Sequence, residues 1–546
     1  MSEPTVTPEA TSPEPAVDAA GPTPPETAAA PPTGAVGTAR NIALAAMLFA
    51  VAMTFIDQTI VAIASPSIQQ ELSLTRSGTQ WVINAYLLAL AATFALGGRL
   101  ADVLGHRRMV ILGIVGFAGS SALCGATPTG SAAETWIITF RVLQGVSAAI
   151  MIPAALAVVV AAFPLHERGR ALAVFFGVSG ALTAIGPIAG GYLTQWTWRA
   201  IFWINIPVAI IALVLTLLAK IPPSRRREVI DWAGAGLVAL GMGLSVLGFE
   251  QAPVWGWDSP LTWACLAAGL VVLVIFARFE LRRRSPLIKV RVFRDKAFVV
   301  DNVVLFFSMI AFVPAFFFAS TYSQISLGFD ANEAGLYLLV FFAGFAPAAQ
   351  VGGRMLDRGG ARRPMVLGSA LGAVGFALWA DKLTDLSFNA QWPYIVMAGA
   401  GIGLLLGPAS TDAVNRAIDA SYGEVTGITQ TVRNYGSALG IAVLGTVLAT
   451  VLTSRLTDAL VGFGLTPDDA HSVATAAAHQ QNQEAFASVP AALQPKIQDA
   501  VAHSFASASQ WVFYGMAIAL GVSFLAALRH PRTPRTEAAA SSTASV

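Results

Sequence analysis

Long apolar runs alternate with short polar segments along most of the chain. The apolar runs have about 18 to 25 residues, the length that an α-helix needs to cross about 30 Å of hydrocarbon. An even number of such runs places both termini on one side of the membrane. We predict fourteen membrane-spanning helices, at residues 41–63, 80–100, 109–127, 136–162, 170–193, 199–219, 232–249, 260–279, 298–322, 334–356, 364–380, 392–411, 425–453 and 510–528.

The composition supports this pattern. Of the 546 residues, 55% are hydrophobic and only 12% are charged, whereas about 25% of the residues of a soluble domain are charged. The sequence therefore predicts an all-α polytopic membrane protein. Most Lys and Arg residues fall on the side of the termini, so the positive-inside rule predicts that both termini are cytoplasmic.

The two ends of the chain differ from the rest. Residues 1–38 are rich in Pro, Ala, Thr and Glu and lack an early apolar core, which predicts a disordered cytoplasmic tail and not a cleaved signal peptide. Residues 529–546 predict a second disordered cytoplasmic tail. The basic clusters inside the chain suit orientation signals that also contact anionic membrane lipid, and we expect no nucleic-acid partner because no soluble module is predicted.

A short polar sequence occurs twice, each time after an apolar run: GRLADVLGHRR begins at Gly98 and GRMLDRGGARR begins at Gly353. Glycine near a helix end permits close backbone approach and a sharp turn. An Asp can face the N-terminus of a neighbouring helix, and Arg can bind carboxylates or lipid phosphate. We interpret the two copies as a conformational latch, formed by Gly98, Asp102, Gly105, Arg107, Arg108, Gly353, Asp357, Arg358, Arg362 and Arg363.

A duplicated latch predicts a duplicated half, an arrangement that is common in secondary transporters. The two copies are further apart than six helices require, so the seventh and eighth helices are additional. We expect a six-helix bundle at 39–220, two extra helices with basic cytoplasmic linkers at 221–297, and a second six-helix bundle at 298–528. This second bundle includes a long external loop at 454–509, in which we expect short amphipathic helices at the membrane surface.

The latch sequence resembles the signature of the major facilitator superfamily, and the fourteen-helix plan resembles its drug:proton antiporter branch. Further motifs are similar to those of this branch: FIDQTIVAIASPSI at 55–68, RVLQGVSAA at 141–149, GPIAGG at 186–191 and WRAIFWINIP at 198–207. The resemblance implies two six-helix bundles around a central site. It also implies that GPIAGG, with Gly186, Pro187, Gly190 and Gly191, is the motif that marks antiporters.

Ionisable residues inside the predicted spans are few. Asp57 lies well inside the first span, where an Asp costs about 2.5–3.5 kcal/mol on insertion scales. A carboxyl group there suits proton coupling, because burial favours its neutral form and a nearby Arg favours its charged form. Arg141 in the fourth span needs a partner, and the resemblance implies a role in proton transfer. A purely structural role remains open for both residues, and the sequence leaves open whether they meet.

Polar side chains in the spans are candidates for substrate binding, together with aromatic residues that could line an apolar cavity. We name Asn84, Tyr86, Gln144, Asn205 and Arg433 as candidate substrate-binding residues. Asp301 and Asp412 lie near helix ends, which favours capping or snorkelling.

The sequence predicts a proton-coupled antiporter that exports amphipathic drugs, antibiotics or related metabolites across a bacterial plasma membrane. We expect a monomer whose partners are small amphipathic substrates, protons and lipid. Neither a phosphate-binding loop nor paired Cys or His ligands occur, so we expect no cofactor, no metal site and no enzymatic activity. Two alternatives remain: a proton-coupled importer or facilitator of a small metabolite, and a transport-inactive membrane sensor or scaffold.

Overall fold

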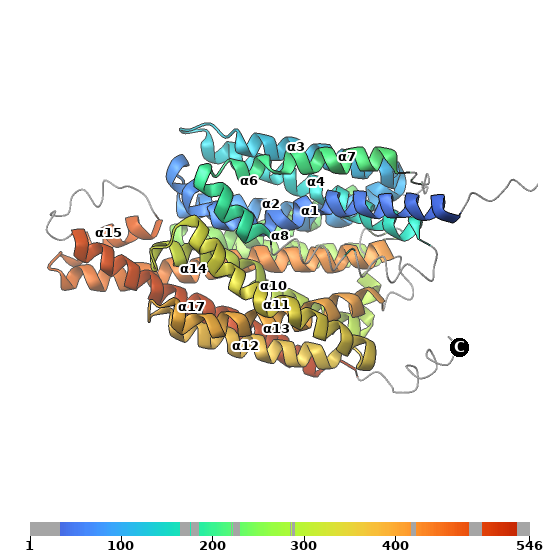
Figure 1. Cartoon of the computed structure of the whole chain (residues 1–546). Helices are drawn as coiled ribbons and strands as arrows, with labels where there is room; N and C mark the ends of the chain where they lie inside the picture. Colours follow the sequence, from blue (N-terminus) through green and yellow to red (C-terminus); the bar gives the residue numbers. More distant parts are fainter. Residues whose placement is uncertain are drawn as a thin grey trace, which may run out of the picture.

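The computed structural model describes residues 33–163, 175, 185–219, 221, 230–283, 286, 290–415, 422–479 and 494–531. These residues form one elongated bundle of helices (Figure 1). The α-helices are α1 (Thr33–Leu72), α2 (Arg76–Leu104), α3 (His106–Gly125), α4 (Ala133–Ala162), α6 (Ala200–Trp203), α7 (Asn205–Leu218), α8 (Trp232–Trp255), α9 (Pro260–Arg282), α10 (Lys296–Ile325), α11 (Ala331–Gly359), α12 (Arg362–Leu383), α13 (Phe388–Asn415), α14 (Tyr422–Gly462), α15 (Pro467–His479) and α17 (Gln494–Leu528). A short 3₁₀ helix covers Val290–Arg294, and residues 185–196 are also helical.

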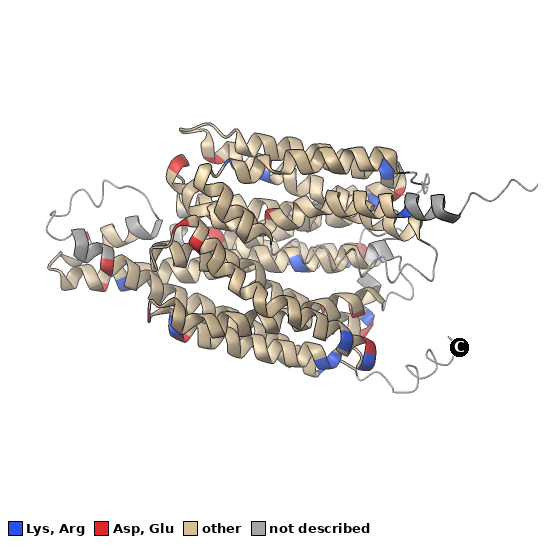
Figure 2. Ribbon diagram, viewed as in Figure 1, with Lys and Arg blue, Asp and Glu red and all other residues tan. Residues whose placement is uncertain are grey.

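The predicted spans agree with this helix order. Among the described residues, 13 helices are long and apolar enough to cross a membrane. The predicted fifth span, 170–193, lies largely outside the described residues. Charged residues gather toward the two ends of the bundle and leave its middle largely uncharged (Figure 2). This distribution is the one that a hydrocarbon layer around the middle of the bundle requires.

Most helices are longer than the apolar runs that predict them. Polar side chains cap their ends and satisfy backbone N–H groups beyond the apolar part. Thr75 caps α2, Asp295 caps α10, and Asp330 caps α11 in a capping box with Glu333. An apolar run therefore marks only the part of a helix that lies in hydrocarbon.

The helices pack in two sets with the same internal pattern. In the first set α4 packs against α2 and α3, and α1 packs against α7; in the second, α13 packs against α11 and α12, and α10 packs against α17. Equivalent glycines permit close contacts in the two sets. A Cβ at Gly97 would lie 2.1 Å from the carbonyl oxygen of Ala149 on α4, and a Cβ at Gly352 would lie 2.4 Å from that of Leu404 on α13. The sets are the two halves that the repeated sequence predicts.

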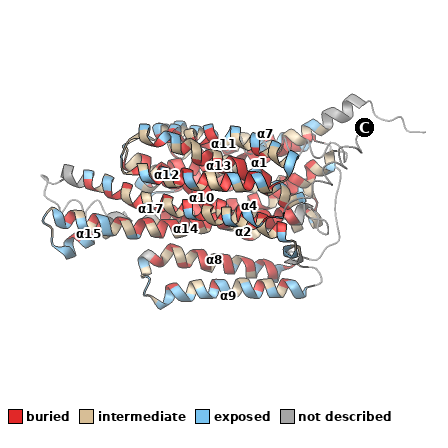
Figure 3. Ribbon diagram, turned by 90° about the horizontal axis from the view of Figure 1, so that it is seen from below, coloured by how far each residue is buried: buried red, intermediate tan, exposed pale blue. Residues whose placement is uncertain are grey.

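The two additional helices lie beside the two halves as a pair (Figure 3). α8 packs against α9, α2 and α14, whereas much of the apolar surface of α9 is exposed. An apolar surface of this kind on a spanning helix faces lipid. Because α2 belongs to the first half and α14 to the second, α8 contacts both halves along the line where they meet.

Much of the predicted external segment at 454–509 is helical among the described residues. α14 continues to Gly462, α15 follows, and α17 begins at Gln494, so only a short part of that segment lies between described helices. Leu456, Leu460 and Val473 belong to a small apolar core that holds α14 and α15 together. In Figure 1 these helices extend beyond the rest of the bundle at one end. His471 on α15 and His503 on α17, two of the polar residues of this segment, are exposed.

Candidate functional site

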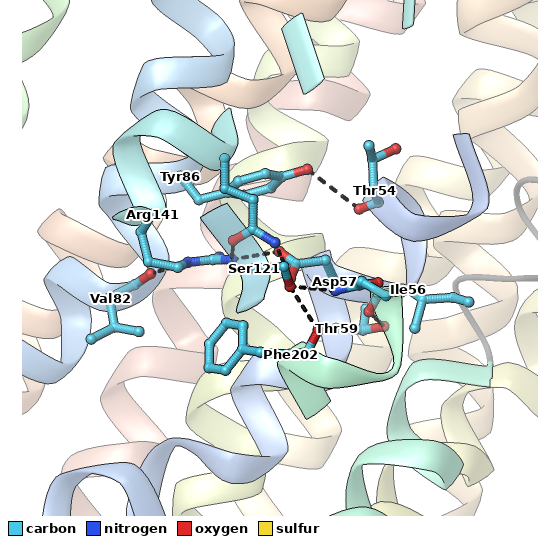
Figure 4. Close-up of polar contacts among 11 residues, drawn as sticks. Thr54, Ile56, Asp57, Thr59, Val82, Tyr86, Ser121, Arg141 and Phe202 are labelled. Carbon is cyan, nitrogen blue, oxygen red and sulfur yellow. Dashed lines mark hydrogen bonds and ion pairs between the residues drawn. The ribbon is translucent and has the colours of Figure 1, made fainter. Parts of the chain in front are cut away.

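Asp57 on α1 and Arg141 on α4 point toward each other (Figure 4), and Gln144 of α4 completes a hydrogen-bonded cluster with them. Arg141 Nη1 lies 2.6 Å from Asp57 Oδ2, and the side chains of both residues are buried. Gln144 Nε2 donates to Asp57 Oδ1 at 3.1 Å, while Gln144 Oε1 accepts from Arg141 Nη1 at 2.8 Å. The two ionisable residues that the sequence singles out therefore meet, and Gln144 bridges them.

Arg141 is fixed by further contacts from α2. Its Nε donates to the carbonyl oxygen of Val82 at 2.7 Å, and its guanidinium carbon lies 4.5 Å from the centre of the Tyr86 ring. Tyr86 is held in turn by a hydrogen bond of 3.4 Å from its hydroxyl group to the carbonyl oxygen of Thr54. Arg141 Nη2 has no hydrogen-bond partner among the described residues. The guanidinium group thus keeps one donor nitrogen unused while the Asp57 pair is closed.

A buried ion pair of this kind is a poor source of stability. Two charges lose their hydration on burial, and their attraction offsets that cost only when the geometry and the extra hydrogen bonds are good. Removing one partner leaves an uncompensated charge and typically costs about 3–5 kcal/mol. The cluster is therefore sensitive to any event that neutralises Asp57.

The glycines of the GPIAGG segment lie against α1 next to this cluster. A Cβ at Gly186 would lie 1.9 Å from Oγ1 of Thr59, two residues after Asp57, and a Cβ at Gly190 would contact Ile60. On the other side, a Cβ at Gly191 would lie 2.8 Å from the carbonyl oxygen of Ala331 at the start of α11. The segment therefore fits closely between the first half and the second half.

The five candidate substrate-binding residues do not form one group. Tyr86 and Gln144 belong to the Asp57 cluster, and Asn84 donates to Glu250 on α8. Asn205 donates to Ser121 Oγ at 2.9 Å within the first half, and Arg433 donates to Gln430 on its own helix at 2.7 Å. Aromatic side chains pack against one another between α10 and α11: Phe316 meets Phe341 edge to face, and Phe341 stacks on Phe345.

The latch residues have equivalent positions in the two halves. Gly105 and Gly360 separate consecutive helices with φ of 99° and 78°, a region that favours glycine. Arg107 and Arg362 each donate to a carbonyl oxygen near the end of a helix, α7 and α17 respectively. Asp102 Oδ1 lies 3.8 Å from His106 Nε2. Close backbone approach is found one residue before the first glycine of each copy. Gly98 and Gly353 have room for a Cβ, and Asp357, Arg108, Arg358 and Arg363 make no hydrogen bond or ion pair among the described residues.

His530, which the sequence analysis does not single out, connects the ends of three helices. Its Nε2 lies 3.3 Å from Asp301 Oδ1 at the start of α10 and 3.1 Å from Asp412 Oδ2 near the end of α13. Its Nδ1 lies 2.9 Å from the carbonyl oxygen of Pro531. Two carboxylates and a carbonyl oxygen face the ring nitrogens, an environment that favours the charged imidazole with hydrogen on both nitrogens.

These three residues have the spacing of a metal site, but their contacts argue for a hydrogen-bonded cluster. One ligand atom from each lies within 4.8 Å of the others. A ring nitrogen that donates a hydrogen bond has no lone pair for a metal, so the direct His530 contacts favour an ion cluster. Burial of the imidazole opposes its charge, yet the hydrogen bonds to Asp301 and Asp412 outweigh burial and raise the pKa of His530 to about 9.

Glu250 is the second functional candidate that the sequence analysis missed. It is 2% exposed and lies on α8, where Asn84 Nδ2 of α2 donates to its Oε1. The predicted helix ended at residue 249, which would leave Glu250 in a polar loop. The signal that could have found it is an isolated carboxylate directly after a long apolar run.

Two helical bundles of equal internal packing, with an acid and an arginine buried between spanning helices, define a membrane transport protein built from repeated halves. The sequence of residues 47–441 matches the Major Facilitator Superfamily. The chain belongs to this family.

Relatives and solved structures agree with this assignment. The chain is 35% identical over 409 residues to the tetracenomycin C resistance and export protein of Streptomyces glaucescens, with 74% of this chain and 75% of the relative covered. It is 30% identical over 407 residues to the multidrug resistance protein Stp of Mycobacterium tuberculosis, with 74% and 75% covered. Its fold is similar to that of a bacterial homolog of the human lysosomal transporter Spinster, with a TM-score of 0.62, 16% identity, and 91% and 99% of the chains covered.

Proposed function

We propose that this protein is a proton-coupled antiporter that exports amphipathic drugs, antibiotics or related metabolites. In this proposal it is a multi-pass monomer of the bacterial plasma membrane with both termini in the cytoplasm. The relatives named for antibiotic export and multidrug resistance support the substrate class. The buried cluster of Asp57, Arg141 and Gln144 supports proton coupling, and it is the observation on which the proposal depends.

The chemistry of the cluster suits a proton switch. A proton on Asp57 removes the negative charge that holds Arg141 Nη1, while the hydrogen bonds of Arg141 to Val82 and Gln144 remain possible. The guanidinium group is then a buried charge without a counter-charge, which is unfavourable. Protonation therefore favours a conformation in which Arg141 regains water or another partner, and the free energy of proton binding becomes available for the conformational change.

The described conformation is closed at the end where α1 and α10 end. Gln324 Nε2 of α10 donates to the carbonyl oxygen of Ile63 at 3.2 Å, and a Cβ at Gly335 would lie 2.5 Å from the carbonyl oxygen of Pro187. A Cβ at Gly445 of α14 would lie 2.3 Å from Gln80 Nε2 of α2. We assign this closed end to the external side, so the closed Asp57–Arg141 pair belongs to the state that follows proton release to the cytoplasm.

The proposed cycle has two parts. In the outward-facing state Asp57 takes a proton from outside, the pair with Arg141 weakens, and the two halves rock toward the inward-facing state. A substrate from the cytoplasm or inner leaflet then binds, Asp57 loses its proton to the cytoplasm, and the pair closes again. Each ligand shifts the equilibrium only by the difference between its affinities for the two states.

Inverted membrane vesicles with an acidic interior and an internal pH-sensitive dye test this proposal. Adding a substrate such as ethidium outside should dissipate the pH gradient in wild-type vesicles, because each exported molecule releases protons from the interior. Asp57→Asn should reduce this exchange about tenfold or more, since the amide binds no proton in this range. Asp381→Asn is the matched control, because Asp381 is an exposed carboxylate at the end of α12. Full exchange by Asp57→Asn would show that Asp57 is not the coupling acid.

A further inference from the structure

Glu250 is a buried carboxyl residue that makes no hydrogen bond with Asp57, Arg141 or Gln144. It lies on α8, one of the two helices that are additional to the two halves. Asn84 Nδ2 donates to Glu250 Oε1, and this is the only hydrogen bond of the carboxyl group among the described residues. Both Glu250 Oε2 and Asn84 Oδ1 are buried without a hydrogen-bond partner in the described structure. The two side chains that already contact each other therefore each keep one unsatisfied acceptor oxygen.

A single proton on Oε2 would resolve this imbalance. A protonated carboxyl group has one O–H donor, and Asn84 Oδ1 is an unused acceptor on the residue that it already contacts. A carboxylic acid and an amide then pair through two hydrogen bonds. An ionised Glu250, by contrast, would leave Glu250 Oε2 and Asn84 Oδ1 without a donor. Its negative charge would also be buried without a counter-charge.

The charged residues Arg433, Glu280 and Arg99, on the helices that pack against α8, either lie far from Glu250 along the bundle or bond to residues other than Glu250. On α14, Arg433 donates to Gln430. On α9, the carboxylate of Glu280 lies beside Gly234, at the opposite end of α8 from Glu250. On α2, Arg99 is fifteen residues after Asn84, about four helical turns away. No cation of the described residues hydrogen-bonds or pairs with Glu250, so the neutral form of this carboxyl group is favoured in this conformation.

The site lies where the two halves meet. Directly before Glu250, the carbonyl oxygen of Phe249 accepts from Thr446 Oγ1 of α14 at 2.7 Å. One helical turn earlier, Ser245 Oγ lies 2.7 Å from the hydroxyl group of Tyr435, also on α14. α8 is thus bonded to the second half through α14 and to the first half through Asn84. A motion of α2 relative to α14 must change one of these contacts, so proton occupancy of Glu250 and the conformation of the protein are linked.

The same part of α2 contacts both the Asp57–Arg141 pair, through Arg141, and Glu250. Val82 and Tyr86, which are one helical turn apart, contact Arg141, whereas Asn84 between them contacts Glu250. Residues two apart on a helix point to different sides. A shift of α2 that opens the Asp57–Arg141 pair therefore also moves the amide partner of Glu250.

We propose that Glu250, paired with Asn84, is a second proton-binding site of the transport cycle, which brings a proton from outside into the described inward-facing conformation and releases it to the cytoplasm before the halves rock back. The proposal extends the proton-coupled antiport proposed above and depends on it. Asp57 and Glu250 would each carry one proton per cycle. The exchange of one monovalent cation for two protons moves net charge and responds to the membrane potential, whereas exchange for one proton is electroneutral.

Infrared spectroscopy of the purified protein tests occupancy of the site. The spectrum of the wild type minus that of Glu250→Gln should contain the carbonyl band of a protonated carboxylic acid at neutral pH. Asp381→Asn is the matched control, because Asp381 is an exposed carboxylate at the end of α12. Its difference spectrum should lack that band. A Glu250 difference spectrum without a protonated-acid band would overturn the proposal.

Transport in inverted vesicles tests coupling. The probe is tetraphenylphosphonium or, where a pH gradient does not drive its uptake by the wild type, ethidium. Without a pH gradient, a potential of about 60 mV, positive inside, should drive about tenfold accumulation by the wild type at two protons per cation. Passive entry of the cation is opposed by this potential. Glu250→Gln should abolish this accumulation and retain exchange driven by a pH gradient, since Gln resembles the protonated acid and can keep the contact with Asn84.

The outcomes separate this inference from the proposed function. Loss of pH-driven exchange in Asp57→Asn concerns the proposed function, whereas the response to potential concerns Glu250. A wild type that ignores the potential, or a Glu250→Gln protein that responds to it fully, would overturn the inference and leave pH-driven antiport intact. A Glu250→Gln protein that inserts but exchanges in neither assay would also overturn it. So would a variant with weaker cation binding and an unchanged response to potential, because Glu250 would then recognise the substrate.

Discussion

Arg107 and Arg362 make equivalent hydrogen bonds in the two halves of the protein. Arg107 Nη2 donates to the carbonyl oxygen of Leu217 close to the end of α7, at 3.0 Å. Arg362 Nη2 donates to the carbonyl oxygen of Leu528, the last residue of α17, at 2.9 Å. The final carbonyl groups of a helix carry partial negative charge and lack partners within the helix. Each copy of the repeated sequence thus fastens the start of a helix, α3 or α12, to the last helix of its own half, whereas the sequence predicts carboxylates or lipid phosphate as partners.

Replacing either arginine by Gln should lower thermal stability by a similar amount. A cation at a helix C-terminus contributes about 0.3–1 kcal/mol, so Arg107→Gln and Arg362→Gln should each lower the apparent Tm of the purified protein slightly. Arg108→Gln and Arg363→Gln are matched controls, because these exposed neighbours make no hydrogen bond among the described residues. Equal shifts for the variants and their neighbours would show that the helix-end bonds do not matter for stability.

Gly97 and Gly352 lie at equivalent close contacts between helices in the two halves. A Cβ at Gly97 or Gly352 would meet a backbone carbonyl oxygen at 2.1 or 2.4 Å, so the helices must separate to accept Ala. Overpacking of this kind typically costs about 1–3 kcal/mol. Gly97→Ala and Gly352→Ala should therefore reduce the yield of folded protein and its apparent Tm, as measured by size-exclusion chromatography and thermal unfolding.

The residues directly after these two glycines supply the controls. A Cβ at Gly98 would lie 3.6 Å from the Cβ of Pro153, which is an ordinary van der Waals contact. A Cβ at Gly353 would have no neighbouring atom within 4 Å among the described residues. Gly98→Ala and Gly353→Ala should therefore leave the apparent Tm nearly unchanged. If these two variants were as unstable as Gly97→Ala and Gly352→Ala, close helix approach would not explain the effect.

The sequence predicted the spans and the two halves because apolar run length and an internal repeat are local signals. It predicted Asp57 and Arg141 as functional candidates because a charge inside an apolar run is conspicuous. Gly97 was missed because Gly98 begins the repeated sequence, whereas close approach depends on which residue faces α4.

Glu250 and His530 were missed because their burial depends on partners that are distant in sequence. Glu250 follows an apolar run and is buried only because α2 and α14 cover that part of α8. His530 lies beyond the last span, in a segment that composition assigns to a tail. It is buried because it packs against Asp301 and Asp412, which lie on two other helices. Tertiary packing, which periodicity does not report, determines both sites.

Arg141→Lys should impair transport about as strongly as removal of the charge. Arg141 uses two nitrogens to reach Val82, Asp57 and Gln144 at once, and its planar group lies over the ring of Tyr86. A Lys has one nitrogen at the end of a flexible chain and cannot reproduce these contacts together. We expect pH-driven exchange to fall about tenfold or more, measured with the dye assay and corrected for the amount of inserted protein.

Arg433→Lys provides the comparison for Arg141, because Arg433 is a half-buried arginine whose hydrogen bond among the described residues goes to Gln430 on its own helix. One nitrogen is enough for that bond, so this variant should keep most of its exchange activity. Near-normal exchange by Arg141→Lys would show that a positive charge alone suffices at that position.

His530 should make the stability of the protein depend on alkaline pH. Burial opposes the charge of the imidazole, but the hydrogen bonds to Asp301 and Asp412 raise the pKa of His530 to about 9, above the ordinary value of 6.5. A group whose pKa is raised on folding stabilises the folded state fully below its unfolded pKa. This contribution is lost as the pH rises from about 6.5 through about 9.

Thermal unfolding of the wild type and of His530→Ala between pH 6 and pH 10 measures this contribution. The wild type should exceed the variant in apparent Tm at pH 6 to 7, and the difference should shrink steadily as the pH approaches 10. His503→Ala is the matched control, since His503 is an exposed histidine on α17 and its removal should leave the pH profile of the wild type unchanged. A difference between wild type and His530→Ala that stays constant across this range would mean that the imidazole acts by packing alone and that the charged cluster with Asp301 and Asp412 does not form.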